Sequence, residues 1–378
     1  MMAMPKNFGF GEEEQMLRDA ARRFFEDRLP TDKLHKLVGE DPQPAKGPQC
    51  FWEPALWNEM VALGWTGLAV PERAGGIGMG CVAVAALAEE AGRAALPSPL
   101  IPTLQATYLL AACGSESADA ALSRIAEGSA MTLALTNRQG AWGGAASDVR
   151  VSDGRLSGTA WYVQDAAKVE AYLVRAMDGD SEKLYLVEKG AAGVTLAGDA
   201  IVDLTRDQAR LNLEQADAVE LSDNAASIIA AAEPALFTIL AADMCGAAEW
   251  QLQTTVEYAK VRQQFERQIG FFQAIKHPLV NFMMEIDIAR SHTYNAACSI
   301  DCAEPGAAVA AHMAKSAASD MAAFGSGRSV QFHGGIGFTW ECYVHIYFKR
   351  QNHNLRLMGD GPYHRDRLAS ITLGSEAA

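Results

Sequence analysis

The sequence has little positive charge and no long uninterrupted apolar run. Its 378 residues include 32 lysines and arginines against 46 aspartates and glutamates, so the formal net charge is −14. An acidic surface argues against nucleic acid as the main partner, although it allows a local basic pocket. No apolar run reaches the ~20 residues that span a bilayer, and the N-terminus lacks a charged-then-apolar signal pattern. We therefore expect neither a nucleic-acid partner nor a membrane span.

Cysteine is scarce and shows no metal-binding pattern. There are seven cysteines, an odd number, and no two have the spacing of a zinc ribbon. Cys298 and Cys302 share a face of a predicted helix, but buried thiols are the simpler interpretation. Paired histidine ligands, a P-loop and a Ser–His–acid order are missing too. We predict no metal site, and the thiols favour a reducing cytoplasm.

What is present is the composition of an ordinary globular protein, with 49% hydrophobic and 21% charged residues. The pattern changes twice along the chain, which predicts three domains. Residues 1–122 form an N-terminal helical domain, 123–221 a middle β domain, and 222–378 a C-terminal helical bundle. The predicted fold class is α+β, with an antiparallel β-barrel or sandwich in the middle and a four-helix bundle at the end.

Hydrophobic periodicity gives the elements. The expected helices are 12–29, 56–63, 82–95, 104–113, 236–259, 274–302 and 307–331. The expected strands are 131–135, 149–151, 156–163, 169–174, 184–187 and 209–213. Asp153-Gly154 and Gly179-Asp180 separate such runs and are typical of hairpin turns.

The stretch 257–277, between two long predicted helices, carries more chemistry than a helix turn needs. It contains a basic cluster, Arg262 and Arg267, around an aromatic residue, Phe265. Arginine presents a planar fork of donors that suits a phosphate, and a phenyl ring can cover a flat ligand.

A second stretch, Gln331-Phe332-His333-Gly334-Gly335-Ile336-Gly337, follows an alanine-rich helix. Glycines allow a backbone to approach a ligand closely. The nicotinamide fingerprint needs a strand before its glycines, so it does not apply here. A plain turn that ends a helix remains an alternative interpretation.

These two stretches, in this order and at this spacing, resemble the acyl-CoA dehydrogenase family. The loop Gly64-Trp65…Val70-Pro71-Glu72…Gly75-Gly76-Ile77-Gly78 is similar to one in that family's N-terminal domain. The resemblance covers essentially the whole chain and shares the three-domain order. It implies that the ADP half of FAD is held across a subunit interface by the following residues: Arg262, Phe265, Gln273, Gln331, Gly334, Gly335 and Gly337. One departure is Glu266, where the family usually has glycine.

For the flavin ring, the strand Gly158-Thr159-Ala160-Trp161-Tyr162-Val163-Gln164-Asp165 resembles the family's Trp-Ile-Thr-Asn strand. Tyr162 then takes the Trp position and Gln164 the Thr position, while strand alternation points Trp161 to the other face. An ordinary aromatic in a sandwich core is the alternative. Thr136 matches the Thr of the family's Thr-Glu-Pro segment. Asn137 stands in place of the Glu, and Arg138 in place of the Pro.

The base that removes the Cα proton is the hardest residue to place. Counting back from Arg367-Leu368 puts Asp360 on the family's glutamate position, one methylene shorter than Glu. Asp360 also suits a plain Gly-Asp-Gly-Pro turn. A second family position falls on Leu236, which cannot act as a base. Glu233 lies one turn earlier, but Pro234 gives it the look of a helix start.

The resemblance extends to partners. A branch of the family that acts on steroid side-chain CoA thioesters pairs two different subunits in an α2β2 tetramer, one carrying the FAD grip and the other the base. This chain fits such a subunit, and a homotetramer is the alternative. An electron-transferring flavoprotein is the expected acceptor. The competing interpretations are an oxidase or hydroxylase of the same fold and a non-catalytic subunit that needs a partner.

Overall fold

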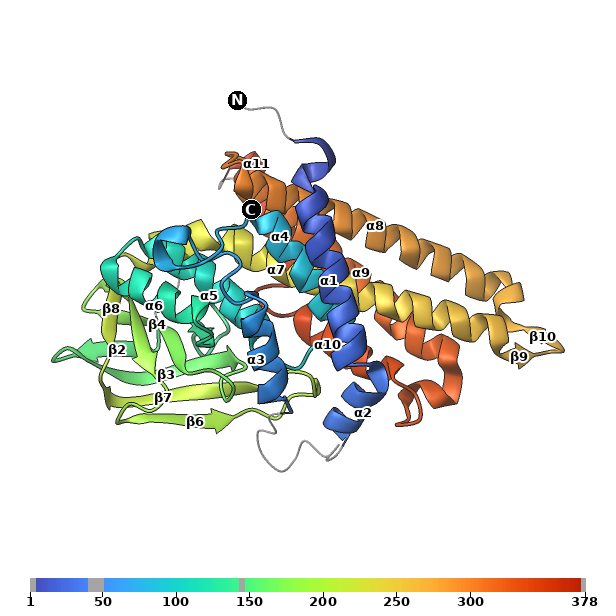
Figure 1. Cartoon of the computed structure of the whole chain (residues 1–378), viewed down its shortest axis with the longest axis horizontal. Helices are drawn as coiled ribbons and strands as arrows, with labels where there is room; N and C mark the ends of the chain where they lie inside the picture. Colours follow the sequence, from blue (N-terminus) through green and yellow to red (C-terminus); the bar gives the residue numbers. More distant parts are fainter. Residues whose placement is uncertain (1–4, 40–50, 143–146, 375–378) are drawn as a thin grey trace. The chain divides into compact units, whose positions relative to one another are not determined.

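The computed structural model describes residues 5–39, 51–142 and 147–374. Along the chain, N-terminal helices lead to an eight-stranded sheet, and long helices follow (Figure 1). This order confirms the predicted α+β class. Cys50 lies outside the described residues, and the other six cysteines carry thiols.

The chain divides into two compact units, and each is built from separate segments. The helical unit comprises Met1–Glu40, Cys81–Leu96 and Phe237–Ala378, and the sheet unit comprises Asp41–Gly80 and Pro97–Leu236. The division into three consecutive domains stays a prediction.

The helical unit is made of amphipathic and alanine-rich helices. Its elements are α1 (Glu12–Arg28), α2 (Thr31–Gly39), α4 (Cys81–Arg93), most of α7 (Ala225–Val261), α8 (Gln273–Asp301), α9 (Ala307–His333), α10 (Val344–Asn354) and α11 (Gly361–Leu373). At the start of α1, the Glu14 carboxylate accepts a hydrogen bond from the Gly11 N–H at 2.8 Å. This bond satisfies one of the amides that every helix start leaves unpaired. Pro30 separates α1 from α2, which the sequence did not predict as a helix.

Glycines let the helices of this unit approach closely. A Cβ on Gly246 of α7 would lie 1.7 Å from the carbonyl oxygen of Glu89 on α4, and one on Gly92 would lie 1.9 Å from that of Asp243. Beside this crossing, Arg350 of α10 forms a buried ion pair with Asp243. The core of the unit therefore depends on glycine at the contact.

Helix α7 is long and apolar enough to cross a membrane by length and composition alone. Polar and charged residues interrupt its sequence, so no single apolar run has that length. However, 61% of its apolar window is buried inside the protein. Helix α7 is therefore a core helix.

The sheet unit contains one eight-stranded sheet with the order β6-β7-β3-β2-β4-β5-β8, and β1 pairs with β4. The strands are β1 (Met131–Ala134), β2 (Val149–Ser152), β3 (Arg155–Gln164), β4 (Ala171–Asp178), β5 (Ser181–Glu188), β6 (Val194–Gly198), β7 (Gln208–Ala216) and β8 (Val219–Ser222). Most pairs are antiparallel, as predicted, but β1 and β2 each pair with β4 in parallel. The accompanying helices are α3 (Pro54–Ala62), α5 (Leu100–Cys113) and α6 (Glu116–Ala126).

Both predicted hairpin turns are present. Asp153 and Gly154 join β2 to β3 with φ of 51° and 76°, and Gly179 follows β4 with φ of 60°. Strand β3 also has an irregularity between Ala160 and Val163, where Tyr162 has φ of 57°. This bulge interrupts the strict alternation on which the expected direction of Trp161 rested.

Candidate active site

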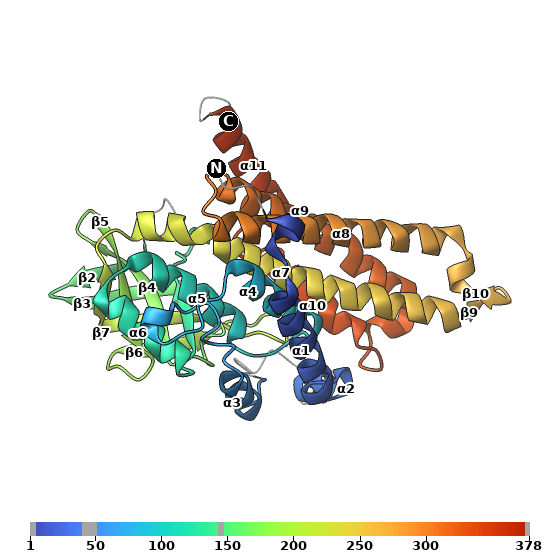
Figure 2. The same ribbon diagram turned by 45° about the horizontal axis from the view of Figure 1, so that its top comes forward.

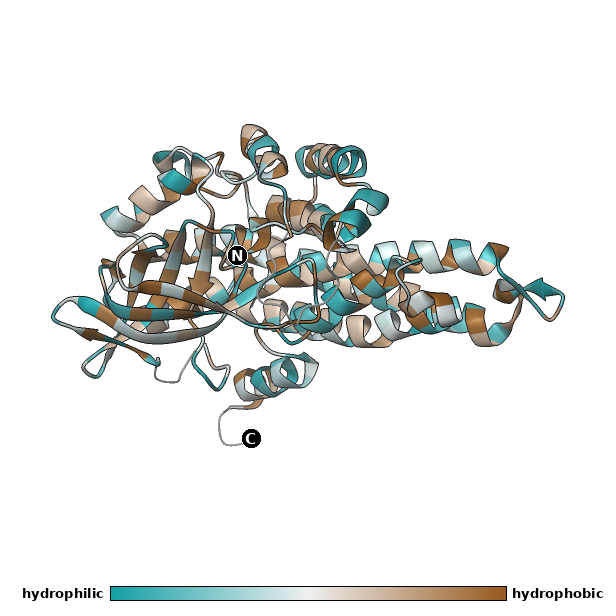
Figure 3. Ribbon diagram, turned by 90° about the horizontal axis from the view of Figure 1, so that it is seen from below, coloured by the Kyte–Doolittle hydropathy of each residue, from teal (hydrophilic) through white to brown (hydrophobic). Residues whose placement is uncertain are grey.

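The turn between α7 and α8 is a two-stranded hairpin at the end of both helices (Figures 1 and 2). Strands β9 (Gln263–Gln264) and β10 (Arg267–Gln268) form it, and the carbonyl oxygen of Arg262 accepts a hydrogen bond from the Ile269 N–H at 2.8 Å. The strands of this hairpin are hydrophilic in Figure 3. Phe265, at the turn between them, is 86% exposed. A fully exposed phenylalanine on a polar tip fits a residue that covers a ligand or partner.

The conformation of the hairpin explains why glycine suits the position that Glu266 occupies. Phe265 and Glu266 are the two turn residues, and both have positive φ, 52° and 62°. A two-residue turn with this backbone favours glycine, asparagine or aspartate. The family's glycine thus suits the turn geometry, and Glu266 adopts the same backbone at a conformational cost.

The glycine turn forms a 3₁₀ helix, η5 (Gly334–Phe338), directly after α9. Its glycines have two different environments. A Cβ on Gly337 would lie 2.6 Å from the Val330 carbonyl oxygen, whereas nothing lies within 4 Å of a Cβ on Gly334 or Gly335. Gly337 is therefore needed for packing, while the backbone at Gly334 and Gly335 is exposed.

The two turns lie close together because α7 contacts the end of α9. The rings of Tyr258 and His333 stack with centroids 4.4 Å apart, and the Tyr258 hydroxyl donates to the His333 carbonyl at 3.3 Å. Burial lowers the pKa of His333, which favours a neutral ring in this stack. Arg262 follows Tyr258 by one helical turn, and Gln331 and Gly334 flank His333. The structure thus gathers the predicted ADP-binding residues of the helical unit at one end of two helices.

Aromatic residues complete this end. Gln273 is the first residue of α8 and is exposed. Just before it, Phe272 meets Phe265 edge to face, and the Arg267 guanidinium lies 4.5 Å from the centre of the Phe271 ring. The surface therefore presents donors and ring faces together, which suits an anionic nucleotide.

In the sheet unit, the structure brings together the three residues predicted to contact the flavin ring. The Thr136 carbonyl accepts a hydrogen bond from the Trp161 N–H at 2.9 Å, next to Tyr162. The Gln164 side-chain amide donates to the Tyr162 carbonyl at 3.0 Å. Tyr162 is 40% exposed, and its hydroxyl donates to the Arg138 carbonyl.

A buried charge cluster that the sequence analysis missed follows this strand. Asp165, Lys168, Arg206 and Asp207 are all buried. The Lys168 ammonium lies 2.6 Å from Asp165 and 3.6 Å from Asp207, and Arg206 lies 3.7 Å from Asp165. The sequence signal that could have indicated this cluster is the presence of four charged residues next to apolar strands. The cluster fixes the end of β3, next to Tyr162 and Gln164.

Asp360 is the N-cap of α11. Its carboxylate accepts a hydrogen bond from the Tyr363 N–H at 3.0 Å, and the side chain is exposed. This is the geometry expected of a capping aspartate, so the turn interpretation accounts for its conformation. Its assignment as the base stays a prediction.

The alternative, Glu233, lies inside α7, and Pro234 is an interior residue of that helix. The expectation that Pro234 marks a helix start was wrong, because α7 begins at Ala225, more than two turns earlier. One carboxylate oxygen of Glu233 accepts a hydrogen bond from the Trp142 indole at 3.0 Å. Leu236 is buried, as is Phe237.

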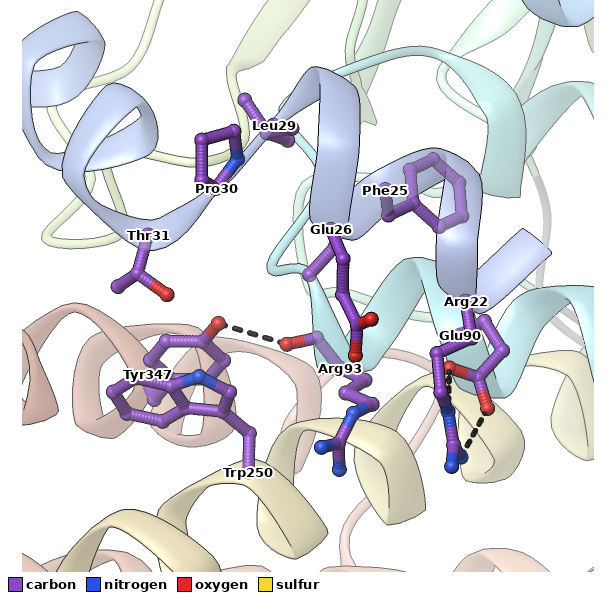
Figure 4. A pocket seen from close by; sticks show the side chains of 11 residues that line it. Arg22, Phe25, Glu26, Leu29, Pro30, Thr31, Glu90, Arg93, Trp250 and Tyr347 are labelled. Atoms are coloured by element: carbon purple, nitrogen blue, oxygen red, sulfur yellow. Dashed lines mark hydrogen bonds and ion pairs between the residues drawn. The ribbon is translucent and has the colours of Figure 1, made fainter. Parts of the chain in front are cut away.

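A separate pocket of about 280 Å³ lies in the helical unit (Figure 4). Its wall contains the parallel stack of Trp250 and Tyr347, with centroids 3.8 Å apart, and the ion pair between Arg22 and Glu90. None of the residues that the sequence predicted as catalytic or cofactor-binding lines this pocket. Within the described ranges, no three His, Cys, Asp or Glu side chains gather to hold a metal ion.

Known proteins match the chain along most of its length. The acyl-CoA dehydrogenase N-terminal domain profile matches residues 11–129, and the C-terminal domain profile matches residues 238–369. The acyl-CoA dehydrogenase IpdE2 of Mycobacterium tuberculosis is 30% identical over 348 residues, which are 92% of this chain and 93% of that protein. The chain belongs to the acyl-CoA dehydrogenase family. It is an oxidoreductase of a family that is FAD-dependent.

Solved structures agree with the fold. A variant of the Tcur3481-Tcur3483 steroid ACAD has a TM-score of 0.86 and 29% identity, covering 98% of this chain and all of that one. The ChsE4-ChsE5 complex from Mycobacterium tuberculosis has a TM-score of 0.86 at 23% identity, covering 98% and 100%. The acyl-CoA dehydrogenase resemblance read from the sequence is thereby confirmed.

Proposed function

We propose that the chain binds FAD and takes part in the α,β-dehydrogenation of a bulky acyl-CoA thioester, with steroid side-chain thioesters as the substrate class. The contact between Tyr258 and His333 carries the proposal, because it gathers the arginine turn and the glycine turn. The steroid class is supported by the relative described as a steroid ACAD, at 29% identity.

The residues of this chain fit a dinucleotide with an anionic end. Arg262 is exposed beside Phe265, and the uncovered backbone at Gly334 and Gly335 allows close approach. Gln273 and Gln331 offer side-chain amides from α8 and α9. In the sheet unit, Thr136, Tyr162 and Gln164 would contact the flavin ring. When bound, FAD supplies the acceptor for the Cβ hydride.

Asp360 is the proposed acceptor of the Cα proton. Its carboxylate sits at the N-terminus of α11, where the helix dipole favours a negative side chain. The cap hydrogen bond from Tyr363 fixes the direction of the carboxylate. A base must be both aimed and unprotonated, so this anchoring suits the role if the substrate reaches the turn.

A second candidate function is an FAD-gripping subunit whose partner supplies the base. The exposure of Asp360 favours this candidate, because proton abstraction calls for a site that excludes water. In both cases we propose a tetramer, an α2β2 heterotetramer or a homotetramer, that works in the cytoplasm and passes electrons to an electron-transferring flavoprotein. The paired name of the Tcur3481-Tcur3483 relative fits the two-subunit form.

The test is anaerobic reduction of the flavin in the complex purified from the native host, with acyl-CoAs of increasing bulk. We expect bleaching of the flavin by bulky thioesters. If none of the acyl-CoAs bleaches the flavin, this result would contradict dehydrogenation and favour an oxidase or hydroxylase of the same fold.

Asp360→Asn separates the two candidates. If Asp360 is the base, flavin content stays unchanged and the reduction rate falls by about 10²–10⁴-fold. If the rate does not change, Asp360 is removed from the mechanism, which favours a base supplied by a partner subunit. Arg262→Ala should instead release FAD, because a charge-assisted phosphate contact is lost, whereas the exposed Arg23→Ala serves as a control that keeps it.

A further inference from the structure

A lysine with no exposed surface, Lys315 on α9, lies beneath the turn that carries Asp360. Its ammonium donates to three oxygens: the Gly359 carbonyl at 2.8 Å, the Ser319 hydroxyl at 3.1 Å and the Leu355 carbonyl at 3.3 Å. An ammonium has three N–H donors, so the protonated form satisfies all three acceptors. A neutral amine has two N–H donors, so it can donate to only two of the three oxygens.

Neighbouring side chains of α9 bind the same turn. The Ser316 hydroxyl donates to the Gly361 carbonyl at 3.3 Å, and the Ser319 hydroxyl donates to the Leu355 carbonyl at 3.4 Å. One face of α9 therefore holds the backbone on both sides of Asp360. The carbonyls point toward α9, while the Asp360 carboxylate remains exposed.

The turn itself allows little variation. Met358 and Gly359 have positive φ, 53° and 90°. A Cβ on Gly359 would lie 2.2 Å from the Tyr363 ring, and one on Gly361 would lie 2.4 Å from the Asp320 carboxylate. A strained turn persists only where its surroundings determine it, and the lysine supplies the strongest of these contacts.

A lysine is an expensive way to fill this space. Burying an ammonium costs free energy, and a methionine of similar length would pack without that cost. Burial lowers the pKa of Lys315 to about 7, although the negative charge of Asp360 opposes the shift. Stability alone does not account for the charge, so its position under Asp360 calls for a functional explanation.

The other titratable groups nearby leave Lys315 as the buried cation of the turn. Burial lowers the pKa of His364 to about 3, and the charges of Lys315 and His312 add to this shift. Burial also lowers the pKa of His312, and the positive charge of Arg367 acts in the same direction. The two imidazoles share a hydrogen bond of 2.8 Å between their Nδ1 atoms, as two neutral rings do. Arg365 and Asp320 form an exposed ion pair, and Arg356, Asp366 and Arg367 are exposed as well.

We propose that Lys315 is a positioning residue, whose buried ammonium holds the Gly359–Gly361 turn and thereby aims the Asp360 carboxylate. This inference rests on the proposed function, in which Asp360 takes the Cα proton. Activity then needs an unprotonated Asp360 and a protonated Lys315. The rate should fall on the alkaline side as Lys315 loses its proton.

The first experiment uses Lys315→Met in the flavin-loaded complex, with the exposed Lys36→Met as control. We expect the rate of flavin reduction at saturating substrate to fall by about 10–100-fold, the effect of a displaced reacting group. Flavin content and KM should stay close to wild type, and the alkaline limb of the pH profile should disappear. An unchanged rate and profile would overturn the proposal.

Ser319→Ala gives a second readout if Lys315→Met does not fold. Removing one acceptor of the ammonium disfavours its charged form, so the alkaline limb should move to lower pH. An alkaline limb that stays in place would show that Lys315 does not set it.

Hydrogen exchange of residues 355–365 separates this proposal from the proposed function. In Lys315→Met the amides of Tyr363 and His364, which bond to Asp360, should exchange at least about tenfold faster than in Lys36→Met. If exchange is faster in Lys315→Met but no acyl-CoA reduces the wild-type complex, the proposed function is refuted and the anchoring is kept. Unchanged exchange with an active wild type would refute the anchoring alone.

Discussion

At the residue scale, the glycines of the glycine turn have different roles: one is needed for packing, and another leaves room for a ligand. Gly337 faces the Val330 carbonyl, whereas Gly335 faces open space. A resemblance to a family motif cannot make this distinction, because both positions are simply glycine in the sequence. The structure therefore assigns different consequences to the same substitution.

Gly335→Ala and Gly337→Ala form a matched pair. We expect Gly335→Ala to keep its melting temperature but to lose flavin, because the new methyl group would meet a bound pyrophosphate. Gly337→Ala should lower the free energy of unfolding by about 1–3 kcal/mol through overpacking. Thermal unfolding and flavin absorbance measure both effects. Equal flavin loss at equal stability would show that the two glycines do not differ in role.

Lys315 should also make stability depend on pH. Its pKa is lowered from 10.5 to about 7 in the folded chain, so between these values the unfolded chain binds more protons. The cost of burying the cation is present in full below about pH 7 and disappears toward pH 10.5. The stability of the wild type relative to Lys315→Met should therefore rise with pH in this window. Denaturant unfolding at pH 7, 8 and 9 measures it, and a constant difference would contradict the shift.

At the element scale, the helices of the helical unit meet through small residues. Gly325 and Gly327 both lie inside α9, but a Cβ on Gly325 would lie 1.8 Å from the Phe282 ring of α8, while Gly327 faces open space. Gly325→Ala should destabilise by about 1–3 kcal/mol, and Gly327→Ala should stabilise by up to about 1 kcal/mol, since alanine is the better helix former. Chemical denaturation of the two variants tests this contrast, and the same sign for both would count against it.

Periodicity predicted the long elements because α1, α8 and α9 repeat apolar residues over many turns. It missed α2, β6 and β8, which are short, and also α6, α10 and α11. It placed the start of α7 near Pro234 because proline usually begins or breaks a helix. The conformations of Tyr162 and Glu266 were also beyond sequence reasoning. A bulge and a positive-φ turn depend on partner strands and on the chain around them.

The candidate site divides in the same way. Motif spacing found Arg262 and the glycine turn, and the structure brings them together through a contact, Tyr258 with His333, that no local pattern indicates. Lys315 escaped prediction because it lies among alanines on an ordinary helix. Its importance comes from oxygens about forty residues further along the chain.

At the scale of the whole molecule, the proposed assembly can be tested by colour. We expect the chain co-expressed with a paralogous acyl-CoA dehydrogenase subunit from a neighbouring gene to be yellow, with bound FAD. The chain expressed alone should hold less flavin, because the exposed Phe265 and the open glycine turn would lack their partner. Flavin counted per chain, with the mass of the complex, decides it. A fully loaded monomer would contradict the assembly.

The interleaving of the two units also has a consequence for synthesis. The stretches that end at Glu40 and Leu96 belong with residues from Phe237 onward, so they leave the ribosome long before their packing partners exist. We expect a protease to digest the first helices readily in nascent chains halted before α7. Protection should appear in a single step, after the later helices have been synthesised. Such a protein would rely on chaperones during translation more than one whose domains emerge whole.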